Sequence, residues 1–318
     1  MSAPVLRHAG IDLGGTKTEI AVVDAQGIEH CRFRRPTPRD DYAGTLRLIR
    51  DLIGEAEARC GPVDSVGIGT PGAVIPATGL MKNCNSTWLN GRPLPADLEQ
   101  ACGRAVRLAN DADCFALSEA TDGAGAGVRT LFGVIAGTGV GGGIVVDGRL
   151  LRGPNAIAGE WGHNPMPSLD GAPEAVRQCG KDLASRACYC GRADCVETWV
   201  SGPALVRSWR ELGGRAGEDA DVEALLRAQE ADPAARTALE LHAWQFAAAL
   251  ATVINVLDPD RIVLGGGLSN LARLYTEVPA RWDAFVFGGR VRTPLLAPRH
   301  GDSGGVRGAA WLGAASIT

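Results

Sequence analysis

The chain has 318 residues, which is enough for two domains with separate hydrophobic cores. Its net charge of −4 and its pI of about 5.8 argue against a nucleic-acid-binding or membrane-surface protein. We find no signal-peptide core and no run of about 18 apolar residues, so we expect a cytoplasmic protein. Nine cysteines, an odd number, then favour free thiols and a metal site over a disulfide framework.

The first predicted element, within residues 8–24, is a pair of strands joined by a glycine turn. Backbone N–H groups at such a turn can bind phosphate, and Asp12 at the strand end can hold a hydrated Mg²⁺. A plain hairpin explains the same residues equally well. This segment alone therefore leaves phosphate binding open.

Residues 41–91 are predicted to form a helix, a strand and a polar loop. Apolar positions at helical spacing predict the helix over residues 41–60. The segment 65–72 is typical of a strand that ends in a Gly/Pro loop, which either borders a ligand or is an ordinary turn. We expect the polar loop 82–91, which contains Asn85 and the aromatic residue Trp88, to form a wall of the substrate site.

A short predicted strand over residues 105–109 leads into Asn110 and Asp111, which open a predicted helix. Asp and Asn are favoured N-caps, so Asp111 or Asp113 can simply cap this helix. Alternatively, Asp111 lies at the carboxyl end of a strand and faces a crevice, where ligands bind in open α/β sheets. The segment alone does not decide between the two interpretations.

The run 131–136 predicts a buried strand, and a glycine-rich segment follows it. Gly137, Gly139 and Gly142 satisfy the dinucleotide-binding pattern G-x-G-x-x-G, but that pattern requires a helix after the glycines. Here residues 144–146 predict a second strand, and Asp147-Gly148 predicts a further hairpin. This context argues against a nicotinamide-dependent oxidoreductase and repeats the strand, turn and strand of residues 8–24.

The segment from Glu160 to Glu197 has the most specific spacing in the chain, Glu-x-x-His followed by Cys-x-Cys-x4-Cys-x-Glu. Its Cys3His set is typical of a closed tetrahedral zinc site, and four protein ligands favour a structural over a catalytic ion. Three unpaired thiols are the alternative, and Cys179 falls outside the tight spacing, so we leave it out. The ion would bring the two carboxylates together. The predicted ligands are His163, Cys188, Cys190 and Cys195.

The remaining chain is predicted to be mainly helical. One long helix covers residues 232–257 and ends at Asp258-Pro259. A strand over 261–264 turns at glycines 265–267 into another predicted helix. Such a turn admits an adenosine close to the backbone or is merely a tight junction. A closing helix is predicted from Val306 onward.

Together these motifs resemble the ROK family of sugar kinases over essentially the whole chain. The matching motifs are residues 12–17, 69–72, 110–111, 137–139, 160–163, 188–197 and 265–267. Segments 85–91, 159–165 and 300–311 are most similar to bacterial fructokinases that also accept mannose. Asp194 departs from the family pattern, which has glycine there, and we expect it to strain the turn.

The resemblance implies an α/β protein with the actin-like, hexokinase-like ATPase fold (ribonuclease H-like), in which two α/β domains flank a cleft. We expect a small domain of residues 1–115 and 305–318. A large domain of residues 116–304 would contain the zinc site and the nucleotide site. The resemblance also implies a homodimer.

The implied activity is ATP-dependent phosphorylation of the 6-hydroxyl of D-fructose, and also of D-mannose, with Asp111 as the general base. A carboxylate with an ordinary pKa near 3.9 suffices, because positioning and charge neutralisation dominate phosphoryl transfer. The implied substrate-binding residues are Asn85, Asn110, Asp111, Glu160, His163 and Glu197. The residues implied to bind ATP and Mg²⁺ are Asp12, Gly14, Gly15, Thr16, Lys17, Thr138, Gly139, Gly266 and Gly267.

Two alternatives remain at this stage. Spacing does not distinguish epimers, so a kinase for glucose, N-acetylglucosamine or N-acetylmannosamine is the main one. A transcriptional repressor of the same family is the other, but repressors carry an additional N-terminal helix-turn-helix domain, whereas here the first strand begins near residue 8. The expected partners are therefore a hexose and ATP, without nucleic acid or membrane.

Overall fold

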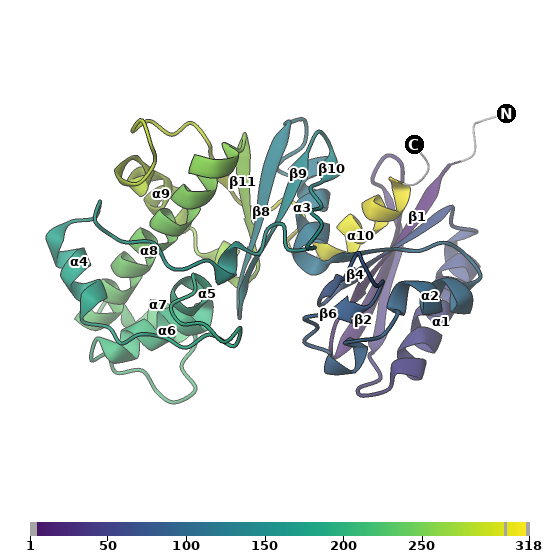
Figure 1. Ribbon diagram of the computed structural model, residues 1–318, viewed down its shortest axis with the longest axis horizontal. Coiled ribbons are helices and arrows are strands. Elements are labelled where there is room, and N and C mark those ends of the chain that lie inside the picture. The colour runs from purple at the N-terminus through teal and green to yellow at the C-terminus, as the bar shows by residue number, and fades with distance from the viewer. Residues whose placement is uncertain (1–4, 302–303, 316–318) are drawn as a thin grey trace. The chain divides into compact units, whose positions relative to one another are not determined.

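The computed structural model describes residues 5–301 and 304–315, and it divides into two compact units (Figure 1). The first contains the chain up to Arg129, Gly143–Gly159 and the chain from Arg299 onward. The second contains Thr130–Gly142 and Glu160–Pro298. The predicted domain boundaries at residues 115 and 305 stay a prediction. Asp302 and Ser303, part of the fructokinase-like segment 300–311, lie outside the described residues, as do residues 1–4 and 316–318 of the predicted small domain.

The first unit is built on a five-stranded sheet of order β3-β2-β1-β4-β7. β1 pairs antiparallel with β2, whereas β1, β4 and β7 are parallel neighbours. β1 and β2 confirm the predicted hairpin, and β3 is an additional strand that the pattern did not predict. The strands are β1 (Arg7–Leu13), β2 (Lys17–Asp24), β3 (Glu29–Pro36), β4 (Ser65–Thr70) and β7 (Arg107–Asn110), with β5 (Ala73–Val74) and β6 (Met81–Lys82) in a separate small sheet.

Helices cover this first sheet. α1 confirms the predicted helix, and the Asp41 carboxylate caps it by accepting the Gly44 N–H at 2.7 Å. α10 returns from the end of the chain and packs against β1 and β4 (Figure 1). Glycine allows this approach, because a Cβ on Gly10 or Gly67 would lie about 2 Å from a carbonyl oxygen of α10. The helices are α1 (Tyr42–Cys60), η1 (Thr87–Leu89), α2 (Leu94–Cys102), α3 (Asp111–Thr121) and α10 (Gly304–Ala314).

The second sheet has the order β10-β9-β8-β11-β12, and the division between the two units falls within β9. β8, β11 and β12 are parallel neighbours, and β9 and β10 form an antiparallel hairpin. Asp147 and Gly148 have φ angles of 50° and 74°, which confirms the predicted two-residue turn. The strands are β8 (Thr130–Ala136), β9 (Val140–Val146), β10 (Arg149–Leu150), β11 (Arg261–Gly265) and β12 (Leu295–Leu296).

The second unit contains the long predicted helix as α8. It begins after Asp232, whose carboxylate accepts the Ala234 N–H at 2.9 Å, and it ends at Leu257, with Asp258 as its C-cap. The helix expected after the 265–267 glycines is instead the 3-10 turn η3 and the one-turn helix α9. The helical segments are η2 (Trp161–His163), α4 (Glu174–Lys181), α5 (Glu197–Val200), α6 (Gly202–Glu211), α7 (Val222–Ala228), α8 (Pro233–Leu257), η3 (Gly267–Asn270), α9 (Leu274–Glu277) and η4 (Pro279–Ala284).

Buried apolar side chains form the cores beneath these sheets. Ile11, Ile20 and Ile68 of the first sheet are fully buried together with Ile49 and Leu52 of α1. In the part of the chain that the structure describes, no helix combines the length and the apolar character that a membrane crossing requires.

Candidate functional site

Three of the predicted site residues meet at one edge of the first sheet. The carboxyl ends of β1, β4 and β7 lie at this edge, because the three strands are parallel neighbours. The strand register pairs Asp12 with Gly69 and Thr70 with Asn110, and Asp111 follows as the first residue of α3. Ligands bind at such edges in open α/β sheets.

Asn110 is the residue that caps α3. Its Oδ1 accepts the Asp113 N–H at 2.6 Å, so neither Asp111 nor Asp113 fills the capping position. The Asp111 Oδ1 accepts the N–H of Ala112 at 2.8 Å, which orients the carboxylate at the start of the helix. The side-chain carbonyl of Asn110 is thus engaged in the cap. The N–H groups of its side-chain amide can still donate to a ligand.

Two carboxylates share this edge, and the charge of Asp111 acts on Asp12. Burial, and then the negative charge of Asp111, raise the pKa of Asp12 to about 6. Desolvation by the surrounding protein raises the pKa of Asp111, while the residue keeps an exposed surface that a substrate hydroxyl can reach. A hydrated Mg²⁺ at Asp12 would favour the ionised form of both groups.

The turn between β1 and β2 presents backbone N–H groups. Gly14 N donates to the Lys17 carbonyl at 3.1 Å, whereas the N–H groups of Gly15 and Thr16 have no hydrogen-bond partner among the described residues. Thr37 supports the turn, because its hydroxyl donates to the Gly14 carbonyl at 2.7 Å. The turn can therefore serve as a small anion site, as the phosphate interpretation requires.

Loop 82–91 is folded around its own side chains. The Asn90 Oδ1 accepts the Cys84 N–H at 2.9 Å, and the Trp88 indole donates to the Thr45 hydroxyl of α1 at 3.3 Å. Trp88 therefore packs on the core of the first unit. Asn85, the predicted sugar contact of this loop, is exposed.

The second sheet also carries glycine turns at its carboxyl edge. β8 and β11 are parallel, so the Gly137–Gly139 turn and Gly266 follow at the same end. Gly266 has a φ of 78°, and a Cβ on it would lie 2.5 Å from the Ala136 carbonyl oxygen. A Cβ on Gly137 would contact the N–H of Gly267 at 3.4 Å, so the two turns are neighbours. Thr138, at the tip of its turn, is exposed.

Glu197 is bonded to the first of these turns. Its Oε2 accepts the Val140 N–H at 2.9 Å, and a Cβ on Gly139 would lie 2.7 Å from the same oxygen. Only glycine fits at position 139 without moving this carboxylate. One oxygen of Glu197 is thus engaged with the backbone, and Oε1 is the atom that it can offer to a ligand.

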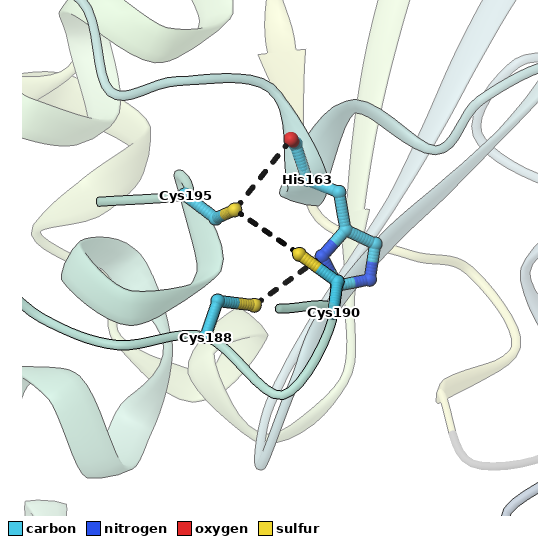
Figure 2. Close-up of side chains that lie close together, drawn as sticks. All are labelled: His163, Cys188, Cys190 and Cys195. Atoms are coloured by element: carbon cyan, nitrogen blue, oxygen red, sulfur yellow. Dashed lines mark hydrogen bonds between the residues drawn. The ribbon is translucent and has the colours of Figure 1, made fainter. Parts of the chain in front are cut away.

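The four predicted metal ligands come together in the second unit (Figure 2). Their donor atoms lie within 4.8 Å of one another. Cys188 Sγ is 3.6 Å from His163 Nδ1, and Cys190 Sγ is 3.6 Å from Cys195 Sγ. Bonds of about 2.3 Å to sulfur and about 2.0 Å to nitrogen would give similar separations around a tetrahedral zinc. The residues therefore fit the predicted ion, whose presence stays a prediction.

Two thiols of this group differ in pKa. Hydrogen bonds, first that of the Arg192 N–H, lower the pKa of Cys190 to about 6, while burial raises that of its neighbour Cys195 to about 12. The thiolate is the form that binds zinc, and binding of the ion would displace the protons of the thiols that coordinate it.

Backbone pairing also holds the metal group together. Met166 N donates to the Asp194 carbonyl at 2.7 Å, and Val196 N donates to the Asn164 carbonyl at 2.9 Å. These bonds join the His163 segment to the Cys195 segment, and Pro165 and Cys195 form an isolated β-bridge. From the sequence, the metal alone was expected to join these two segments, whereas backbone hydrogen bonds join them as well.

Two further details concern the same loop. Cys179 on α4 packs with an apolar cluster and is not among the four gathered donors. Asp194 has a φ of 55°, the left-handed conformation that the family glycine predicts. Its carboxylate compensates by accepting the Ser185 hydroxyl at 2.6 Å and the Arg186 N–H at 2.8 Å.

Two residues near the metal group have a role that was not predicted from the sequence. Arg186 is fully buried, stacks on Trp199 and bonds Glu211 at 2.7 Å, so it anchors the start of the cysteine loop. Tyr189 bonds the second nitrogen of His163. Neither has a local signal, because an arginine and the middle residue of Cys-x-Cys carry no periodic or spacing information.

Comparison with known proteins identifies the family of this chain. The chain matches the profile of the ROK family over residues 8–315. It is 41% identical to the N-acetyl-D-glucosamine kinase of Yersinia pseudotuberculosis serotype O:1b over 96% of this chain and 98% of that one. It is 38% identical to the N-acetylgalactosamine kinase AgaK of Shewanella sp. strain ANA-3, with 96% of each chain covered.

The fold agrees with a solved structure as well. The ROK hexokinase of Thermus thermophilus superposes with a TM-score of 0.82 at 29% identity, over 98% of this chain and 99% of that one. The predicted actin-like, hexokinase-like ATPase fold is thereby confirmed. The chain therefore belongs to the ROK family of sugar kinases.

Proposed function

We propose that this protein is an ATP-dependent kinase that phosphorylates the 6-hydroxyl of an N-acetylhexosamine. The observation that carries the kinase mechanism is the pair of carboxylates at the first sheet edge, Asp12 beside an exposed Asp111. The amino sugar rests on the relatives, which act on N-acetylglucosamine and N-acetylgalactosamine. The fructose and mannose preference expected from segment resemblance has no such support, and glucose remains the second candidate.

In this mechanism Asp111 accepts the proton of the attacking hydroxyl. Its bond to the Ala112 N–H leaves the second carboxylate oxygen for the sugar. Asp12 and the turn at Gly14, Gly15, Thr16 and Lys17 would hold the phosphates and Mg²⁺. The magnesium ion, when bound, neutralises charge that develops on the transferred phosphoryl group.

The second unit would contribute both nucleotide and sugar contacts. Thr138 and Gly139 would contact the phosphates, while Gly266 and Gly267 would lie against the adenosine. The zinc ion, when bound, would supply no chemistry beyond fixing the loop. The proposed sugar contacts of the whole chain are Asn85, Asn110, Asp111, Glu160, His163 and Glu197.

For three of these residues, the structure supports a role as hydrogen-bond donor or acceptor toward the sugar. Asn110 would act as a donor, because its carbonyl caps α3. Glu197 would act as an acceptor through Oε1, since Oε2 holds the Val140 N–H. His163 would donate from Nε2, because Nδ1 faces the thiols. A hydroxyl-rich ligand that both donates and accepts matches this mixture.

The test is ADP release by purified protein with Mg-ATP and a panel of sugars. The panel contains N-acetylglucosamine, N-acetylgalactosamine, glucose, fructose and mannose. We expect the highest kcat/KM on an N-acetylhexosamine. Highest kcat/KM on fructose would restore the expectation from the sequence, and absence of turnover on every sugar with zinc bound would contradict the proposal.

A further inference from the structure

Tyr189 makes the most specific unassigned contact near the proposed sugar site. Its hydroxyl lies 2.9 Å from His163 Nε2, and the two rings meet edge to face at 84° with centroids 5.0 Å apart. The side chain is otherwise 81% exposed, so packing does not explain its orientation. The contact to His163 does.

The geometry defines which atom donates. His163 Nδ1 faces Cys188 Sγ at 3.6 Å, so a ring that binds metal through Nδ1 carries its proton on Nε2. Nε2 then donates to the Tyr189 hydroxyl. The tyrosine backbone is held by a tight turn, in which Cys188 N donates to the Arg192 carbonyl at 2.7 Å and Gly191 N donates to the Cys188 carbonyl at 3.0 Å.

The surroundings of the phenol are those expected for a sugar hydroxyl. The charges of Glu197 and Glu160 both act on Tyr189. Its neutral hydroxyl can accept from His163 and donate in turn, as a sugar hydroxyl would. The same Nε2–H is assigned to the sugar above, and one N–H group cannot serve both partners at full strength.

We propose that Tyr189 is a positioning residue whose hydroxyl occupies the sugar-hydroxyl position at His163 Nε2 in the sugar-free protein and is displaced when the sugar binds. This inference rests on the proposed function, because it needs His163 to bind the sugar. An exposed side chain can rotate into water at little cost, so the displacement is reversible. The consequence is a competition at one hydrogen-bond donor that lowers the apparent affinity for the sugar.

The test is Tyr189→Phe, which keeps the ring and its edge contact and removes only the hydroxyl. In the full-length, zinc-loaded protein we expect the Kd of N-acetylglucosamine, measured by calorimetry, to fall about two- to tenfold, the range for one neutral hydrogen bond. The KM should fall in parallel, while kcat and zinc content stay unchanged. Tyr42→Phe, which loses a hydroxyl bonded to Asp97 in the first unit, should leave the Kd unchanged.

A rise in the Kd of Tyr189→Phe would mean that the hydroxyl binds the sugar directly, and an unchanged Kd would mean that it does not compete. Either result overturns the proposal. The 15N resonance of His163 Nε2 gives a reading that does not depend on turnover, and it should shift in sugar-free Tyr189→Phe. An unshifted resonance overturns the contact itself. Absence of turnover on every hexose, with the shift present, would reject the proposed function alone.

Discussion

The strands of the two sheets follow the same order, the third, second, first, fourth and fifth along the chain, but the carboxyl edges of the two sheets carry different functional groups. At the first edge, Asp12 and Asp111 stand directly on strand and helix ends, so the chain itself sets their positions. At the second edge, glycine turns expose the backbone, and Glu197 and His163 come from two short helical segments, α5 and η2, that are distant in sequence. The functional groups of the first edge are thus carboxylates held by regular secondary structure. Those of the second edge are held by contacts between segments that are distant in sequence.

Loss of the metal should have the largest effect, and only on the second edge. Cys190→Ser removes one thiolate, and a structural zinc contributes on the order of 10 kcal/mol to folding. We expect the variant to purify without zinc, to unfold at a clearly lower temperature and to bind sugar weakly. Elemental analysis and thermal unfolding measure this. Cys179→Ser, outside the metal group, should retain zinc. If chelation left the unfolding temperature of the wild type unchanged, backbone pairing alone would suffice to hold the loop.

Loss of the base should affect turnover and leave the fold intact. Asp111→Asn removes the proton acceptor of the first edge, and we expect kcat to fall about 10²–10⁴-fold. The thermal transition should barely change, because Asn110 is the residue that caps α3. Asp113→Asn, in the same helical turn, is the matched control and should retain most activity. Full kcat in Asp111→Asn would remove the base from the mechanism.

Acid should weaken the second unit through a buried histidine. His242 on α8 is 2% exposed and its Nε2 donates to the Val200 carbonyl at 3.0 Å; burial lowers its pKa from 6.5 to about 4. The folded state therefore binds fewer protons than the unfolded state between these values. The contribution of the neutral His242 to stability is complete above pH 6.5 and is lost as the pH falls toward 4.

That difference in pKa corresponds to about 3 kcal/mol of unfolding free energy. His242→Gln should remove this part of the pH dependence, so the stability difference between variant and wild type should change by about 3 kcal/mol from pH 8 to pH 4. Denaturant titrations at both pH values measure it. The raised pKa of Asp12 acts in the opposite direction but is common to both proteins and cancels. A constant difference would show that His242 does not titrate on unfolding.

The smallest effect is expected at Asp194, which stands in the cysteine loop where the family has glycine. Asp194→Ala keeps the positive φ and loses two hydrogen bonds, so we expect a loss of about 1–2 kcal/mol. Asp194→Gly loses the same bonds but relieves the backbone by roughly 1 kcal/mol, so it should be more stable than the alanine variant. Thermal unfolding ranks the three proteins. Alanine equal to or better than glycine would show that the turn is not strained.

Much of both edges was predictable because their chemistry follows strands and turns. Asp12 and Asp111 were found as polar residues at strand ends, and the parallel register placed them together. The metal ligands were predicted from their spacing, since three thiols within eight residues have few other uses, and the structure brings the four side chains together. The hairpins and α8 followed from periodicity and turn residues.

The sequence by itself determined the family, the two-sheet α/β architecture and the chemical groups at each edge, because these follow from motif spacing and from periods of local structure. Only the tertiary structure decided that Asn110 caps α3, that Glu197 holds the Val140 N–H and that Tyr189 contacts His163. It also decided that backbone pairing joins residues 164–166 to 194–196. Apart from the cap, which is a choice among three polar residues within four positions, these contacts join residues far apart in the chain or depend on a single rotamer. Neither spacing nor periodicity encodes such a choice.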